Sequence, residues 1–185
     1  MRRRYLDAAE AAAQIADRRM ARVEVHRIHA DLHLGNVLLR DGLLTLLDFD
    51  DFVTGPAVQD LWLALPGRGA EVERQRDLLL EGYQELRAFD RTTLDLIEPL
   101  RALRMIRYAV WIARRWDDPA FRIGWPQFGD ADFWRRETED LEEQVAVVRG
   151  EAAPPRDASL PGGREATAPA VELTNKDYFW DWEGD

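Results

Sequence analysis

Apolar residues recur three and four positions apart over most of the chain, a spacing typical of amphipathic helices. The pattern predicts helices over residues 4–22, 58–65, 70–87, 94–116 and 130–148. Thr92 or Thr93 is expected to cap the fourth helix, because hydroxyl side chains accept a hydrogen bond from the first free amides. Prolines and glycines predict a loop over residues 119–129.

Residues 23–51 follow a different pattern. Residues 23–28 suit a short extended segment, and residues 29–36 form a polar loop. Two short apolar runs, 37–39 and 43–47, are joined by Asp41 and Gly42, which favour the positive φ angles of a tight turn. We therefore expect one small β-hairpin in an α+β fold that is predominantly α-helical.

Composition narrows the class of protein. The 185 residues, 46% of them hydrophobic, are enough for one ordinary domain with a core. The net charge of −10 argues against nucleic-acid binding, which needs a basic surface. No run of about 18 apolar residues exists, so we expect no membrane span and a cytoplasmic location. The absence of Cys excludes disulfides and thiolate metal sites.

Lysine is nearly absent. Of the 25 basic residues only Lys176 is a lysine, and it lies in a polar stretch near the end of the sequence. Reactions that need an ammonium group, such as Schiff-base formation, are therefore not expected here.

The main candidate site combines three polar residues. Asp31 is followed five residues later by Asn36, and Asp48 ends the second apolar run. Phosphoryl transfer needs a carboxylate that orients the acceptor and hard oxygen ligands for the metal ions at the phosphates. A kinase catalytic loop and its metal-binding Asp-Phe dipeptide show this spacing.

The segment His29-Ala30-Asp31-Leu32-His33-Leu34-Gly35-Asn36 resembles the catalytic loop of the aminoglycoside phosphotransferase and choline kinase superfamily. Further blocks resemble the bacterial stress-response Ser/Thr protein kinases within it; they span residues 47–51, 55–62, 97–104 and 114–121. The resemblance implies Asp31 as catalytic carboxylate, Asn36 and Asp48 as Mg²⁺ ligands, ATP as co-substrate and a protein Ser or Thr as acceptor.

The same resemblance predicts how the chain is organised. Residues 1–149 are expected to form a kinase-like C-terminal lobe, with catalytic loop 29–36, metal-binding hairpin 37–51 and helical bundle 56–149. Residues 150–185 are expected to be a flexible acidic tail with an aromatic terminus. Only 28 residues precede His29, without Gly or Lys. We therefore expect the ATP-clamping N-terminal lobe to be absent from this chain, with a separate N-terminal lobe as a candidate partner.

Several alternatives remain at this point. Residues 46–50 also suit the Asp-x-Asp nucleophile motif of dehalogenase-type phosphatases, and His29, Asp31 and His33 suit a transition-metal site. The acceptor could be a small-molecule hydroxyl, or the chain could be a non-catalytic binding or regulatory lobe. His29, His33 and Asp50 are candidate supporting residues in the kinase interpretation. Ala30 stands where the superfamily usually has Gly, and we do not interpret it as inactivating.

Other motifs have structural interpretations. The arginines at 101, 104 and 107 are expected to form a charged helix face that pairs with Glu98. The tryptophans at 62, 111, 116, 125 and 134 are expected to pack in cores. The aromatic segment 178–182 is expected to dock, on this lobe or on a partner.

Overall fold

Helices dominate the structure, as the apolar spacing predicts. The computed structural model of the chain describes residues 1–155. These residues divide into two units, one made of residues 1–22 and 95–154 and the other built on residues 23–94. The predicted single lobe over residues 1–149 remains a prediction, and most of the predicted tail lies outside the described residues.

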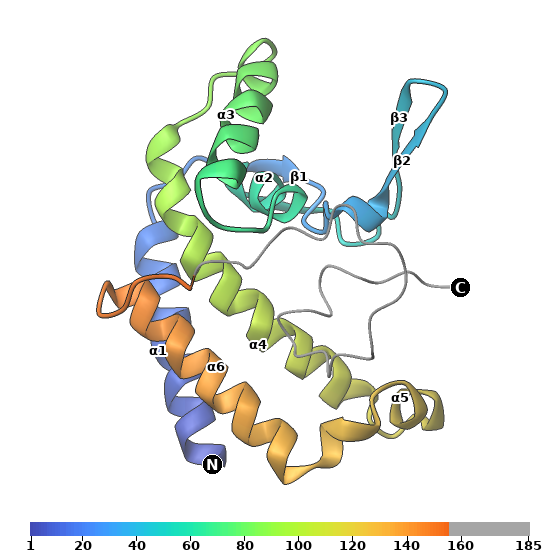
Figure 1. Cartoon of the computed structure of the whole chain (residues 1–185), viewed down its shortest axis with the longest axis vertical. Coiled ribbons are helices and arrows are strands. Elements are labelled where there is room, and N and C mark those ends of the chain that lie inside the picture. Colours follow the sequence, from blue (N-terminus) through green and yellow to red (C-terminus); the bar gives the residue numbers. More distant parts are fainter. Residues whose placement is uncertain (156–185) are drawn as a thin grey trace. The chain divides into compact units, whose positions relative to one another are not determined.

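Three long helices form the first unit. Helices α1 (Arg2–Met20), α4 (Ile97–Arg115) and α6 (Ala131–Arg149) pack pairwise against one another (Figure 1). Small residues allow the close approach of α1, because its buried positions are all alanines. The shared core consists of Ala8, Ala12, Ala102, Met105, Leu141, Val145 and Val148.

An aromatic cluster lies at one end of this unit. Helix α5 (Pro119–Gly124) and the 3₁₀ turn η3 (Pro126–Gly129) occupy the stretch in which the sequence predicts a loop, so that prediction is wrong. The reason is local: the Asp118 carboxylate accepts a hydrogen bond from the Ala120 amide, and Pro119 suits the first helical position. The predicted packing of the tryptophans is confirmed by a cluster that includes Trp111, Trp116, Trp125 and Trp134.

The start of α4 also differs from the prediction. A 3₁₀ turn, η2 (Arg91–Leu96), precedes the helix, which begins at Ile97 without a side-chain cap. Asp90 caps the turn instead, because its carboxylate accepts bonds from the amide and hydroxyl of Thr92. The expected pairing on α4 is confirmed for Arg101, whose Nε lies 3.4 Å from a Glu98 carboxylate oxygen.

The second unit contains all the strands of the described part. Strand β1 (His26–Ile28) pairs antiparallel with β4 (Val53–Gly55), and β2 (Val37–Arg40) pairs antiparallel with β3 (Leu43–Leu46). The predicted hairpin is confirmed, and its turn has the expected positive φ angles, 52° at Asp41 and 78° at Gly42. Helices α2 (Val58–Ala64) and α3 (Ala70–Gln84) follow, and Trp62 of α2 is fully buried.

The extended segment before the loop is confirmed as β1, whereas its partner β4 is not predicted from the pattern. Three residues between a turn and Pro56 are too few to show a strand period. Within residues 1–155, none of the helices combines the length and apolar character needed to cross a bilayer.

Candidate active site

The polar loop of residues 29–36 is anchored by the carboxylate of Asp60. Its two oxygens accept hydrogen bonds from the backbone amides of His29 and Ala30, each at 2.8 Å. Asp60 lies in the first turn of α2, next to fully buried apolar residues. Burial raises the pKa of this carboxyl above its ordinary value, and the two amide bonds oppose that shift. The amides thus compensate the partly buried charge, and the charge in turn fixes the loop.

A second contact from α2 reaches the same loop. The Gln59 amide nitrogen donates to the carbonyl of Ala30 at 3.4 Å, and its oxygen accepts from the Trp62 indole at 3.2 Å. Ala30 has a φ of 69°, in the left-handed region that favours glycine. The backbone strain at this position is therefore held in place by neighbours from another element.

His29 connects the loop to the end of the hairpin. Its Nδ1 accepts a bond from the Asp31 amide at 3.3 Å, so Nε2 carries the proton and donates to the carbonyl of Leu47 at 2.7 Å. The ring also lies 4.8 Å from that of Phe49, centre to centre. The predicted supporting role of His29 thus has a geometric basis as a positioning residue.

Asn36 joins the two ends of the loop. Its side-chain nitrogen donates to the carbonyl of Asp31 at 2.9 Å, and its own carbonyl accepts from the Leu47 amide at 2.9 Å. Because the bond to Asp31 uses the nitrogen, the amide oxygen is the atom that remains for a metal ion. Asn36 is only 9% exposed, so its orientation is well fixed.

Asp48 follows Leu47 directly, and Leu47 contacts both His29 and Asn36 through its backbone. The structure thus ties the sequence-predicted Asp48 to the predicted loop through the residue before it. Asp48 is exposed and has a φ of 58°, a sharp turn of the chain at the end of the hairpin.

The two remaining candidate residues differ in position. His33 lies beside Asp31, with Nε2 3.5 Å from a carboxylate oxygen, and both side chains are about one fifth exposed. Asp50 is exposed, and no hydrogen bond or ion pair among the described residues includes it. His33 therefore remains a candidate supporting residue, and Asp50 forms no hydrogen bond or ion pair with the loop.

The donor set fits a hard cation. Asn36 and Asp48 offer an amide oxygen and a carboxylate, which are ligands that Mg²⁺ prefers. Within residues 1–155, no three side chains of His, Asp or Glu gather closely enough to hold a metal ion. That finding contradicts the transition-metal alternative at His29, Asp31 and His33. The magnesium set is of another kind, because one of its members is an amide.

The phosphatase alternative is also contradicted. The apolar run before Asp48 is one arm of an antiparallel hairpin, and the described strands form two separate antiparallel pairs. Strands alternating with helices, which that class of enzyme needs, are not found in the described part.

Sequence reasoning missed Gln59 and Asp60. Asp60 lies about 30 residues from the amides that it binds, so no local spacing indicates the contact. A signal was nevertheless present, because an acid within the apolar run of residues 58–65 should have a buried partner.

Comparison with known proteins agrees with this geometry. Residues 2–97 match the model of the phosphotransferase enzyme family. Stress response kinase A of Escherichia coli strain K12 is 46% identical over 125 residues, which are 68% of this chain and 38% of that protein. The kinase of the same name from Salmonella paratyphi A is 45% identical over 122 residues, 66% of this chain and 37% of that protein. The Salmonella typhimurium protein named serine/threonine protein kinase RdoA matches to the same extent. The chain thus spans under two fifths of the length of these curated relatives.

Proposed function

The chain belongs to the phosphotransferase enzyme family, and from this premise we propose that it carries the catalytic loop and metal ligands of an ATP-dependent kinase. One observation supports this most strongly: Asp60 braces the loop from α2, while His29 and Asn36 fasten it to the residue before Asp48. Such bracing is expected where catalytic groups must hold one geometry. The kinase names of the relatives point the same way.

Asp31 is proposed as the catalytic carboxylate. It would accept a hydrogen bond from the hydroxyl of the acceptor and orient the oxygen toward the γ-phosphate. The Asp31 backbone is held on both sides, by His29 at its amide and by Asn36 at its carbonyl. His33, 3.5 Å from the carboxylate, would limit the rotation of the Asp31 side chain.

Asn36 and Asp48 are proposed to hold Mg²⁺ through the Asn36 amide oxygen and the Asp48 carboxylate. The ion supplies positive charge at the phosphates of ATP when it is bound. Leu47 would fix the spacing between the two ligands. Its backbone amide donates a hydrogen bond to the carbonyl of Asn36, and Asp48 is the next residue in the chain.

For the acceptor we propose a Ser or Thr hydroxyl of a protein. The support is the name of one relative, the serine/threonine protein kinase RdoA of Salmonella typhimurium. A small-molecule hydroxyl is the alternative acceptor, since one family uses a common catalytic loop on acceptors of different size.

The first experiment measures binding of Mg·ATP to the full chain by calorimetry. Asp48→Ala is expected to weaken binding tenfold or more, because one of the two metal ligands is lost. Asp50→Ala is the matched control, since it removes an equal charge two residues away, at an exposed position without a hydrogen bond or ion pair in the described part. Equal affinities of both variants and the parent would contradict the proposed metal site.

A second experiment separates binding from chemistry. Asp31→Asn should bind Mg·ATP about as tightly as the parent, because Asp31 is proposed to act on the acceptor and not on the metal. Transfer of labelled γ-phosphate to protein hydroxyls should fall by a factor of at least a hundred. Unchanged transfer in this variant would show that another residue orients the acceptor.

A second candidate function is a non-catalytic binding lobe, and the hairpin favours it. Leu39 and Leu44, which are paired across the two strands, are each more than half exposed. A surface of this kind needs a partner, and a separate N-terminal lobe is the partner that we propose. If the full chain binds Mg·ATP but transfers no phosphate, this second function is the better description.

A further inference from the structure

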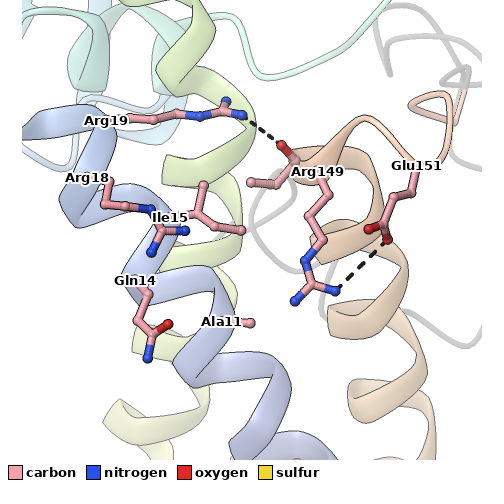
Figure 2. A pocket seen from close by; sticks show the side chains of 8 residues that line it. Ala11, Gln14, Ile15, Arg18, Arg19, Arg149 and Glu151 are labelled. Atoms are coloured by element: carbon pink, nitrogen blue, oxygen red, sulfur yellow. Dashed lines mark hydrogen bonds and ion pairs between the residues drawn. The ribbon is translucent and has the colours of Figure 1, made fainter.

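A pocket of about 500 Å³ lies between α1 and α6 in the unit that does not contain the catalytic loop (Figure 2). Its apolar wall consists of Ala11, Ile15 and Val148. Three arginines and one glutamate supply its charged groups. This volume falls within the range of small-molecule sites.

One of the arginines has a structural role. Arg19 donates to the carbonyl of Val148 at 2.8 Å and to that of Asp95 at 3.2 Å. It therefore links the end of α1 to the ends of two other segments of this unit. The carbonyls do not neutralise its positive charge, which still contributes to the electrostatic potential in the pocket.

The other two arginines face the open space. Arg18 of α1 and Arg149 of α6 both line the pocket, one from each of the two helices (Figure 2). Arg18 has no hydrogen bond or ion pair with any other described residue. Two guanidinium groups that line one pocket from different helices offer charged donors suited to phosphate oxygens.

Glu151 is the acid that competes for this charge. Its carboxylate lies 4.0 Å from the Arg149 guanidinium, and both side chains are about half exposed. An exposed pair at this distance holds weakly. A ligand with a single negative charge would gain little over Glu151, whereas a doubly charged one gains from both Arg18 and Arg149.

We propose that this pocket binds a phosphate dianion, either inorganic phosphate or the phosphate group of a small metabolite. Arg18 and Arg149 hold the phosphate oxygens, and Glu151 is displaced from Arg149 when the anion binds. Ala11, Ile15 and Val148 contact the apolar part of a phosphate ester. All its residues belong to the helical unit, and none of them is a residue of the proposed nucleotide site.

The test titrates inorganic phosphate into the full chain by calorimetry at constant ionic strength and without Mg²⁺. Arg18→Gln and Arg149→Gln are each expected to weaken binding about tenfold, because each removes a charged donor. Arg3→Gln is the matched control; it lies on the same helix, is 92% exposed and does not line the pocket. It should leave the affinity unchanged.

Glu151→Gln gives a result of opposite sign. Phosphate should bind severalfold more tightly, because the competing carboxylate has lost its charge. A purely structural role for these residues predicts no such gain. Acetate at the same concentration should not bind measurably, because a monoanion does not outcompete Glu151.

The proposal is overturned if phosphate does not bind, if acetate binds equally well, or if Arg3→Gln weakens binding as much as the two pocket variants do. Phenyl phosphate distinguishes the two sources of the anion. Tighter binding than inorganic phosphate, reduced by Ile15→Ala, assigns the site to a phosphate ester. Equal binding of the two probes assigns it to inorganic phosphate.

Discussion

At the scale of single residues, the loop of the candidate active site depends on one carboxylate from another element. Asp60 satisfies the amides of His29 and Ala30, two groups that would otherwise be buried without acceptors. The arrangement is reciprocal, because the amides also stabilise a partly buried charge. Loss of either partner leaves the other unsatisfied.

Asp60→Asn should lower the free energy of unfolding by about 1–3 kcal/mol, because the new amide group presents a donor to one of the two backbone donors. Mg·ATP binding should weaken as well, since the loop loses its anchor. Asp41→Asn makes the same chemical change in the exposed hairpin turn and should alter stability by less than about 0.5 kcal/mol. Denaturant unfolding of both variants tests this, and equal stabilities would contradict the bracing role.

Ala30 is a second sensitive position, because it combines a φ of 69° with 4% exposure. Ala30→Gly should change the unfolding free energy by less than about 1 kcal/mol, since relief of strain is offset by a more flexible unfolded chain and a lost methyl. Ala30→Val should destabilise by about 2 kcal/mol or more, because a β-branched side chain suits neither the backbone nor the space. Similar stabilities of the two variants would argue against a left-handed conformation here.

At the scale of elements, α1 is held in its bundle by alanines and by paired side chains at its surface. Arg4 forms two bonds with the Glu142 carboxylate on α6, at 2.9 and 2.6 Å. Tyr5 lies next to this pair and packs its ring edge-on to Trp134, 5.4 Å between centres. Its hydroxyl oxygen is buried without a hydrogen-bond partner in the described part.

Tyr5→Phe should therefore leave the unfolding free energy unchanged or raise it by up to about 1 kcal/mol, because no bond is lost and a buried polar group is removed. Tyr5→Ala is the contrasting variant and should cost about 3 kcal/mol or more through lost packing. Thermal or denaturant unfolding at pH 7 distinguishes them. A clear loss of stability in Tyr5→Phe would reveal a partner for the hydroxyl.

The stability difference between the parent and Tyr5→Phe should also depend on pH. Burial raises the pKa of the Tyr5 phenol, and the charge of Glu137 acts in the same direction. The folded state therefore keeps the proton when an unfolded tyrosine, with a pKa near 10, has lost it. This contribution is fully present below about pH 10 and is lost as the pH rises further. The stability of the parent relative to Tyr5→Phe should thus fall between pH 9 and pH 11, and a constant difference would contradict the raised pKa.

At the scale of the whole molecule, the hairpin stands out because its apolar side chains are exposed. The register places Val37, Leu39, Leu44 and Leu46 on one face of the β2–β3 pair, opposite one another across the strands. Leu39 is 69% exposed and Leu44 is 59% exposed. Such a face favours association with another surface.

The double variant Leu39→Thr and Leu44→Thr should bind less of a hydrophobic dye and self-associate less at high concentration. Its unfolding free energy should change by less than about 1 kcal/mol, because both side chains are largely solvated. Leu86→Thr is the control, as a single exposed leucine outside the hairpin, 93% accessible. Unchanged dye binding and association in the double variant would show that the hairpin face is not a docking surface.

Local pattern was enough for most elements. The five periodic segments contain helices, and the Asp41-Gly42 turn produces the hairpin, because both features depend on residues only a few positions apart. Strand β4 and helix α5 were missed for the opposite reason. Strand β4 has three residues and helix α5 has six, and both are too short for a period to appear. Strand β4 also exists only because β1 pairs with it.

The sequence by itself determined which chemical groups are available and at what spacing, because Asp31, Asn36 and the end of the hairpin lie within one short segment. Only the tertiary structure decided what holds them. The carboxylate of Asp60 lies about 30 residues along the chain from the amides that it binds. The Leu47 carbonyl, which accepts the hydrogen bond from the His29 ring, lies 18 residues from His29. The fold brings these partners together. Contacts between residues so far apart in the sequence depend on how the whole chain packs, and no local pattern determines them.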